Sequence, residues 1–515
     1  MIAPIKFDFK SFYFYNLEKG NRSDDMEILL NEKSKKKIQL FTELLYRENE
    51  EISFSYLQNF LGVSISTLKR YFQELSIDIK NNKTLKHILL IRNVGGYVIR
   101  NHSAHDMDYL IIQLRLSYFE ESLQFKIFLE LLLNHYNSVE DLAEKLYISP
   151  PHLYKNINIL NIELERYPLK IVFHPTTNFE GKEKYIRMLN FYFFWSVYRG
   201  IAWPYDFQNM KYFSENVDFG VLQKNYSDSV IKRLEFMVGL FMVRQDDHPI
   251  RLPKKIKELS KHFATTNAIS KLVEPFLATE DEILFFNLLA RCYISEIDTL
   301  QDKYRLYDSF PRSLPLISAC DLLIEEYEKY FYKDFSMNKE QKTTLFYSLL
   351  IGMIQATYFS ISPIQFFRTA FIENMETKLS IKDNPKVNHF YKKFREKNPD
   401  FPLPTHSDFG ICILLTILTE TFLCPTLSIY IKYSRNSLGS VYIENKLHML
   451  FNPRAIHYTD CLEKADLVII DCFEDREKKN KQKFFYISDV YNEQTWHELF
   501  TCIQTLFFKA KSTFY

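Results

Sequence analysis

The sequence predicts a mainly helical protein of several domains that ends in a small α/β domain. With 515 residues the chain is too long for one hydrophobic core, and three to five domains are expected. Only 11 residues are glycine, which favours helices with few tight loops. From about residue 425 the pattern changes, because strand-like apolar runs then alternate with helical runs.

Residues 54–75, FSYLQNFLGVSISTLKRYFQEL, are predicted to form two short helices joined by a tight turn. Leu57 and Leu61 give the first helix an apolar face, Gly62 makes the bend, and Ser64 has the side chain of an N-cap for the second helix. The second helix then carries an apolar stripe made by Ile65, Leu68, Phe72 and Leu75.

The opposite face of this second helix carries short hydrogen-bonding groups and cations, namely Ser66, Thr67, Lys69, Arg70 and Gln73. A helix that lies in the major groove of DNA needs such a face, without bulky apolar groups. A helical hairpin with a solvated face is the alternative interpretation of this stretch alone.

The same pattern returns in residues 139–164, VEDLAEKLYISPPHLYKNINILNIEL. Eight positions match at a constant separation of 85 residues, from Phe54 with Val139, through Ser64 with Ser149, to Leu75 with Leu160. Two unrelated hairpins would rarely match in this way without a gap. The sequence therefore predicts two tandem helix-turn-helix units.

A helix is predicted before each unit and a hairpin after it. The first hairpin spans Leu85–Arg100 around the turn Asn93-Val94-Gly95-Gly96, which is typical of a wing. The second hairpin, around Leu169–Phe179, is interrupted by His174-Pro175. Between Ser64 and Arg100 seven basic and two acidic residues leave a net charge of +5, which favours attraction to DNA phosphates over a merely solvated surface.

The bulk composition excludes several other classes of protein. The net charge of the whole chain is +1, so affinity for nucleic acid must come from a local patch. The 7 cysteines are scattered without metal-ligand spacing, as expected for reduced thiols in the cytoplasm. The apolar run 409–431 contains Glu420 and Pro425, so it is predicted to be a buried helix leading into a strand and not a membrane span. No Gly-rich phosphate loop or catalytic constellation is present, so an enzyme, a cofactor and a metal site are not expected.

The predicted domains follow one another without long linkers. They are an N-terminal extension (1–32), a first winged helix-turn-helix unit (33–103), a second (104–178), two helical blocks (179–310 and 311–424) and the α/β domain (425–515).

This order of parts resembles the Mga/AtxA group of Gram-positive transcription regulators, stand-alone virulence or global regulators. The motifs ISFSYLQNFLGVSISTLKRYFQEL and SVEDLAEKLYISPPHLYKNINIL carry the resemblance, together with FEGKEKYIRMLNFYFFW at the junction to the first helical block. The resemblance covers nearly the whole chain from about residue 33. It implies a cytoplasmic regulator of transcription, expected to be an activator, that binds double-stranded DNA as a homodimer or higher oligomer.

The resemblance also implies roles for individual residues. Two recognition helices would begin at Ser64 and Ser149. Base edges would be contacted by Ser66, Thr67, Lys69, Arg70 and Gln73 in the first unit and by His152, Tyr154, Lys155, Asn156 and Asn158 in the second. Phosphates would be contacted by Lys80, Lys83, Lys86 and Arg92.

In the related regulators the two helical blocks are domains that proteins of the sugar phosphotransferase system control by phosphorylating histidines. His248 is the first candidate here, followed by His262, His389 and His406, and the alternative for each is a surface histidine without a regulatory role. The α/β domain resembles the IIB component of sugar transporters. Its loop Ser434–Gly439 has no cysteine where a catalytic IIB domain of the cysteine type is phosphorylated, which argues for a retained fold used in dimer contacts.

Two other functions are weighed against DNA binding. The first is a relay component of the phosphotransferase system acting through the histidines and the terminal domain, and the missing loop cysteine counts against it. The second is antitermination by RNA binding, which is known among relatives with such regulatory domains. Two winged units in place of an RNA-binding β module make antitermination the weaker hypothesis.

Overall fold

The computed structural model describes residues 29–165, 167–202, 226–266, 269–294, 296–332, 336–360, 384–423, 426–435, 438–452, 455–472, 482–487 and 489–514. Most of the predicted N-terminal extension lies outside these ranges. The described chain is mainly helical with small sheets, as predicted. It divides into two compact units, one comprising 1–318, 350–377 and 403–407 and the other 319–349, 378–402 and 408–515. Among the described helices, none combines the length and the apolar character that crossing a membrane requires.

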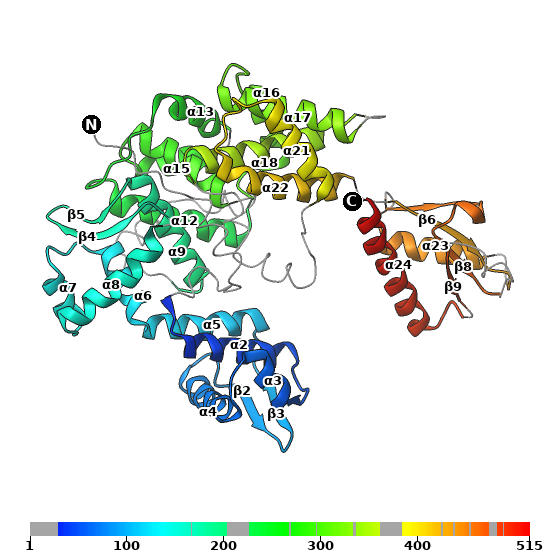
Figure 1. Ribbon diagram of the computed structural model, residues 1–515, viewed down its shortest axis with the longest axis horizontal. Helices are drawn as coiled ribbons and strands as arrows, with labels where there is room; N and C mark the ends of the chain where they lie inside the picture. Colours follow the sequence, from blue (N-terminus) through cyan, green and yellow to red (C-terminus); the bar gives the residue numbers. More distant parts are fainter. Residues whose placement is uncertain are drawn as a thin grey trace. The chain divides into compact units, whose positions relative to one another are not determined.

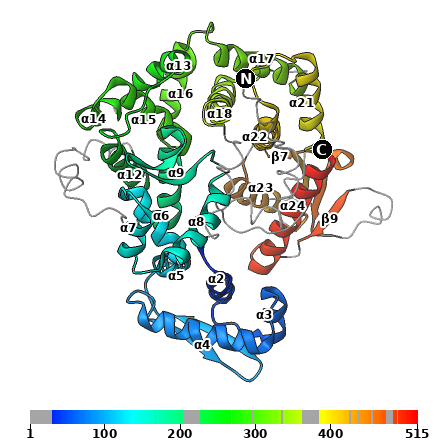
Figure 2. The same cartoon turned by 60° about the vertical axis from the view of Figure 1, so that its left-hand side comes forward.

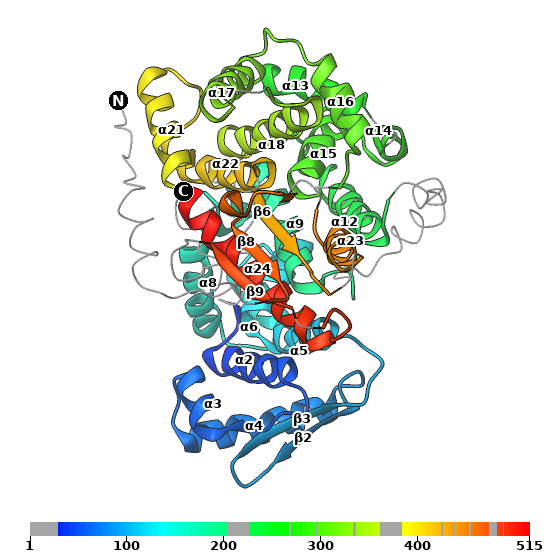
Figure 3. The same ribbon diagram turned by 90° about the vertical axis from the view of Figure 1, so that its right-hand side faces the viewer.

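Residues 29–121 of the first unit form four α-helices and a three-stranded antiparallel sheet in the order β1-β3-β2, and Figure 1 shows the helices with the hairpin of β2 and β3. The elements are α2 (Glu32–Tyr46), β1 (Ile52–Ser53), α3 (Phe54–Leu61), α4 (Ile65–Asn81), β2 (Ile88–Arg92), β3 (Gly96–Asn101) and α5 (Met107–Glu121). Leu40, Phe41, Leu44 and Leu45 of α2 are fully buried. The two helices and the hairpin predicted from the sequence are confirmed, and Figure 3 shows the hairpin running alongside α4.

The next part repeats this order of elements. It consists of α6 (Leu123–Leu133), α7 (Val139–Lys145), α8 (Pro150–Leu164), the antiparallel hairpin of β4 (Lys170–His174) and β5 (Thr177–Glu180), and α9 (Glu183–Tyr198). The second hairpin is therefore present, and its register is irregular between Ile171 and His174. Helix α5 packs against α2 on one side and against α6 and α9 on the other, so it is shared by both repeats.

A helical block completes the first unit. Its helices are α12 (Asp228–Arg244), α13 (Lys254–Ala264), α14 (Ile269–Val273), α15 (Glu280–Tyr293) and α16 (Leu300–Ser309). Helix α9 lies beside α12, as Figure 2 shows. Their contact is aromatic, because the ring of Phe236 lies 5.7 Å from that of Phe191 and 5.8 Å from that of Phe194.

The second unit combines a helical part with the C-terminal α/β domain. Its helical part is built from α17 (Pro315–Phe331), α18 (Lys339–Thr357), α21 (Pro385–Lys397) and α22 (Asp408–Phe422), of which α17 and α18 extend into the first unit. Residues 382–404 are polar and rich in lysine, asparagine and proline, a composition typical of a surface connection. They nevertheless contain the helix α21, which buries Val387, Phe390, Tyr391 and Phe394. The predicted buried helix leading into a strand is confirmed by α22 and the strand after it.

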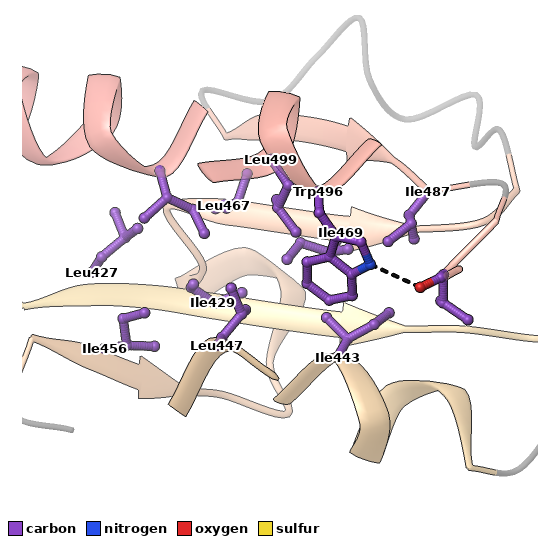
Figure 4. Close-up of a cluster of buried hydrophobic side chains, with 12 residues drawn as sticks. Leu427, Ile429, Ile443, Leu447, Ile456, Leu467, Ile469, Ile487, Trp496 and Leu499 are labelled. Atoms are coloured by element: carbon purple, nitrogen blue, oxygen red, sulfur yellow. Dashed lines mark hydrogen bonds between the residues drawn. The ribbon is translucent and has the colours of Figure 1, made fainter. Parts of the chain in front are cut away.

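The α/β domain has a four-stranded parallel sheet in the order β7-β6-β8-β9. Its elements are β6 (Leu427–Lys432), α23 (Gly439–Leu450), β7 (Ile456–Tyr458), β8 (Leu467–Ile470), β9 (Lys483–Tyr486) and α24 (Glu493–Phe514). The predicted parallel α/β architecture is confirmed, although the three-residue β7 was too short to be recognised. Figure 4 shows its core, where the indole Nε1 of Trp496 donates to the carbonyl of Val490 at 2.7 Å.

Candidate nucleic-acid interface

The turn between α3 and α4 is fixed by backbone geometry and by a cap. Gly62 is left-handed with φ +64°, and its N–H donates to the carbonyl of Asn59 at 3.3 Å. The hydroxyl of Ser64 accepts from the N–H of Thr67 at 3.3 Å, which starts α4 as predicted. A β-carbon at Gly62 would meet no atom within 4 Å, so glycine is favoured there by backbone conformation alone.

The inner face of α4 holds it against the rest of the first unit. Leu68, Phe72 and Leu75 are buried as predicted, whereas Ile65 is 43% exposed because it precedes the buried stripe in the first turn. The ring of Phe72 stacks on Tyr97 of β3 with centroids 3.6 Å apart. The hairpin and α4 therefore share one aromatic core.

The outer face of α4 presents the predicted base-contacting residues. Ser66, Arg70 and Gln73 are exposed, and Thr67 and Lys69 are partly exposed. The hydroxyls of Ser66 and Thr67 each lie 2.9 Å from that of Ser64, so the first turn of the helix carries a small hydroxyl cluster.

The acidic residues of α4 are neutralised on its inner side. Glu74 pairs with Lys33 of α2 at 2.8 Å, and Asp78 pairs with Lys37 at 2.5 Å. The seven basic residues counted from the sequence are Lys69, Arg70, Lys80, Lys83, Lys86, Arg92 and Arg100, and all but the partly exposed Lys69 are exposed. Within the described part of the chain none of these seven forms an ion pair, so the outer face of the first unit keeps its positive charge.

Arg92 lies at the tip of the hairpin, next to the turn. Its guanidinium carbon is 6.0 Å from the ring centre of Phe54. The turn is held in place because the side chain of Asn93 donates to Glu51 at 2.9 Å. Gly96 must be glycine, since a β-carbon there would lie 2.1 Å from the carbonyl oxygen of Ile52.

The turn of the second repeat uses the same hydrogen bonds as the first, again 85 residues later. The N–H of Tyr147 donates to Glu144 at 3.1 Å and that of Ile148 donates to Ala143 at 3.0 Å, as Gly62 and Val63 do to Asn59 and Gln58. Tyr147 occupies the left-handed position with φ +55°, although it is not glycine. The constant separation therefore holds for backbone geometry as well as for residue type.

Helix α8 presents most of the second set of predicted contacts. His152, Tyr154, Lys155 and Asn158 are exposed. Asn156 is buried and its amide donates to the carbonyl of His152 at 2.9 Å, so its side chain is not available on the outer face. Ser149 is exposed and precedes α8 without a side-chain capping hydrogen bond, unlike Ser64.

A comparison with protein families identifies this second repeat. Residues 110–194 match the family model of the Mga helix-turn-helix domain. The chain carries a Mga helix-turn-helix domain. The predicted relation to Mga/AtxA-type regulators is confirmed, and the Mga domain supports a DNA-binding regulator with DNA as its partner. No curated protein matches the chain.

The Mga domain begins in α5, contains α7 and α8, and ends within α9. The last helix is joined to the following helical block by a buried ionic network that the sequence did not reveal. Arg187 of α9 is fully buried and pairs with Glu282 of α15, which is also fully buried. Arg244 of α12 pairs with Glu183 of α9 at 2.6 Å. Two arginines and two glutamates thus connect three helices with no net charge.

His248 lies at the edge of this network. Its carbonyl accepts from Nη2 of Arg187 at 2.9 Å, and its N–H donates to the carbonyl of Arg244 at 2.9 Å. Burial lowers the pKa of the His248 imidazole, and the nearby Arg244 guanidinium lowers it further. Its ring is therefore largely neutral at pH 7, the form that can accept a phosphoryl group.

The other three candidate histidines lie in different settings. His262 is partly buried near the end of α13, with its ring 5.2 Å from that of Phe310. His389 is exposed on α21, and His406 is exposed in a single 3-10 turn at Thr405–Ser407.

The predicted loop after β6 contains an internal anion that sequence reasoning missed. The carboxylate of Asp471, at the end of β8, accepts from the N–H groups of Ser434 at 2.9 Å and of Arg435 at 3.1 Å, and from the Ser434 hydroxyl at 3.0 Å. Burial opposes ionisation of Asp471, but these hydrogen bonds outweigh it and hold its pKa below the usual value. The backbone donors of Ser434 and Arg435 are therefore already used by a protein carboxylate.

Proposed function

We propose that the protein is a transcription regulator that binds promoter DNA through two winged helix-turn-helix units, residues 33–103 and 104–178. The observation that carries the proposal is the uncompensated positive face of the first unit. Between Ser64 and Arg100 the two acids, Glu74 and Asp78, turn inward to α2, while the seven basic side chains of the same span remain without ionic partners among the described residues. A face of this kind supplies the counterion-releasing attraction that brings a protein onto a duplex.

The residues divide into two groups by the contacts they can make. Lys80, Lys83, Lys86 and Arg92 surround the end of α4 and the hairpin, and we assign them to phosphates. Ser66, Thr67, Lys69, Arg70 and Gln73 line the outer face of α4 and are assigned to base edges. In the second unit we keep His152, Tyr154, Lys155 and Asn158 and leave out the buried Asn156.

Regulation is assigned to the helical blocks 179–310 and 311–424. Phosphorylation of His248 by proteins of the sugar phosphotransferase system would place negative charge beside the network that joins α9 to α12 and α15. New attraction to Arg187 or Arg244 would compete with their bonds to Glu282 and Glu183. The domain at 425–515 is assigned to contacts between subunits of a homodimer, and the sign of regulation is proposed to be activation.

The second candidate function is a phosphotransfer relay. It would need a phosphoryl acceptor in the loop after β6, where the chain has no cysteine and where Asp471 occupies the backbone N–H groups of Ser434 and Arg435. Incubation with phosphorylated general proteins of the system and a sugar acceptor tests it. Sugar phosphate formed at a catalytic rate would favour the relay over the regulator.

The decisive experiment measures binding of the purified protein to labelled promoter duplexes over a salt series. The test variant is Lys69→Ala/Arg70→Ala on α4. The control variant is Lys254→Ala/Lys255→Ala, which removes the same charge from exposed positions of α13. The test variant should lose about 1–3 kcal/mol of binding free energy per lost base contact, and the control should bind as wild type does. Folded protein that binds no duplex at low salt would refute the proposed function.

A further inference from the structure

The two helix-turn-helix units differ sharply in charge. From the N-cap of its first helix to the end of its hairpin, the first unit (Ser53–Asn101) has seven basic and two acidic residues, a net charge of +5. The same span of the second unit (Ser138–Glu180) has four basic and six acidic residues, a net charge of −2. A surface with more acidic than basic groups is repelled by the phosphate backbone.

Equivalent positions of the two recognition helices show where the difference arises. At the separation of 85 residues, Lys69 of α4 corresponds to Tyr154 of α8, and Lys80 corresponds to Glu165. A cation of the first unit is thus replaced at each of these two positions, whereas Arg70 corresponds to the exposed Lys155 and the charge is kept there. The acids of α7 add to the difference in charge, because Glu140 and Glu144 are exposed.

The start of each recognition helix adds a second difference. Helix α4 begins with Ile65 and Ser66, whose backbone N–H groups are available to an anion at the helix N-terminus. Helix α8 begins with Pro150 and Pro151, which have no N–H groups. The first turn of α8 therefore lacks two of the backbone N–H groups that could hold a phosphate.

The second unit exposes uncharged groups on α8 and in the turn before it. The side chain of Tyr147 is 96% exposed in the turn, and those of Tyr154 and Ile162 on α8 are 50% and 62% exposed. Asn158 is exposed one turn beyond Tyr154. Asparagine can pair with the edge of adenine, and apolar groups can contact the methyl group of thymine.

We propose that phosphate anchoring is confined to the first unit and that the second unit contacts base edges, chiefly through the uncharged side chains of Tyr154 and Asn158. This inference rests on the proposed function. The first unit then sets the salt-dependent affinity, because each phosphate contact adds about 0.9 to the slope of log affinity against log salt. The second unit sets the discrimination between sequences.

The test compares two pairs of exposed lysines, each replaced by glutamine. Lys83→Gln/Lys86→Gln removes two charges from the first unit, and Lys145→Gln/Lys170→Gln removes two from the second. Binding to one A·T-rich duplex is measured from low to moderate salt. The first pair should reduce the slope by about 2, and the second should leave it unchanged. An equal reduction by both pairs overturns the inference.

The second arm measures discrimination between an A·T-rich and a G·C-rich duplex of equal length at one salt concentration. Tyr154→Ala/Asn158→Ala should reduce the affinity ratio at least tenfold, or to unity, without changing the salt slope. Lys83→Gln/Lys86→Gln should leave the ratio unchanged. An unchanged ratio in the Tyr154/Asn158 variant, or equal binding of both duplexes by wild-type protein, overturns the assignment of discrimination to the second unit. Absence of all duplex binding refutes the proposed function itself, which distinguishes the two failures.

Discussion

The phenolic hydroxyl of Tyr118 donates to the carboxylate of Asp78 at 2.5 Å. Asp78 belongs to α4, the proposed recognition helix of the first unit, and Tyr118 belongs to α5, which runs into the Mga domain. Lys37 of α2 completes the cluster, with its ammonium 2.5 Å from the same carboxylate and 4.4 Å from the ring centre of Tyr118. Three helices are thereby fixed to one another through a single carboxylate.

Replacement of Tyr118 by phenylalanine should therefore destabilise the protein. The partly buried carboxylate of Asp78 would lose one of its two donors, at a cost of about 1.5–3 kcal/mol. Urea unfolding measures the change in the free energy of unfolding. Tyr109→Phe is the matched control on α5, because the Tyr109 hydroxyl has no hydrogen bond among the described residues. Equal stability of the two variants would contradict the role given to the Tyr118 hydroxyl.

The two turns allow opposite substitutions to be compared at equivalent positions. Gly62→Ala should destabilise the first unit by about 1 kcal/mol, because alanine is strained at φ +64°. Its β-carbon would meet nothing within 4 Å, so backbone strain is the whole of the expected effect. Tyr147→Gly should stabilise the second unit by up to about 1 kcal/mol, because it relieves the strain at φ +55°. Thermal melting checks both. A loss of stability in Tyr147→Gly would show that the tyrosine ring makes a compensating contribution.

The buried pair of Arg187 and Glu282 should be sensitive to the loss of either partner. Arg187→Met leaves the fully buried Glu282 without its ionic partner, and Glu282→Leu leaves the fully buried Arg187 with Glu183 as its remaining ionic partner. Each single change should cost about 3–5 kcal/mol, and the double variant should cost less than the sum of the two. Chemical unfolding of all four proteins gives the coupling energy. Strict additivity would mean that the two groups do not stabilise each other.

The stability of the first unit should also depend on pH through His248. In the folded protein the pKa of His248 lies below the ordinary value of 6.5. Burial is the main cause, and the positive charge of the nearby Arg244 adds to it. The unfolded chain then binds more protons than the folded chain at acid pH, so this histidine reduces stability as pH falls through about 6.5. His248→Gln should reduce the loss of unfolding free energy between about pH 7.5 and about pH 5. An unchanged or steeper loss in the variant would contradict the assignment.

Much of the fold follows from local patterns in the sequence. Apolar spacing, the glycine turn and the serine cap predict α3 and α4. Because the same pattern recurs 85 residues later, it also predicts α7 and α8. That separation also predicts the burial of Asn156. It corresponds to Tyr71, which is buried on the inner side of α4, so Asn156 was to be expected on the inner side of α8.

The missed features depend on partners that are distant in the sequence or on weak local patterns. Arg187 and Glu282 are 95 positions apart, and nothing near either residue specifies the other. From the sequence alone Asp78 is indistinguishable from an ordinary surface carboxylate, because its partners Lys37 and Tyr118 are about 40 positions away. Helix α21 was obscured because lysine, asparagine and proline surround its apolar stripe. The exposed ring of Tyr147 at a glycine position likewise has no local sequence signal.

The way α9 is buried decides how this protein can be divided for study. The Mga match ends at residue 194, in the last third of that helix. A fragment ending there would expose the ring of Phe191, which lies 4.9 Å from Tyr293, and would separate Arg187 from Glu282. Such a fragment would present to water an aromatic surface that normally faces α12 and α15, and it would aggregate. A fragment through residue 318 keeps α12 and α15 against α9 but loses the contacts of Lys184 and Tyr185 with Tyr358 and Ser360, so the fragments to express are those that extend beyond Ser360.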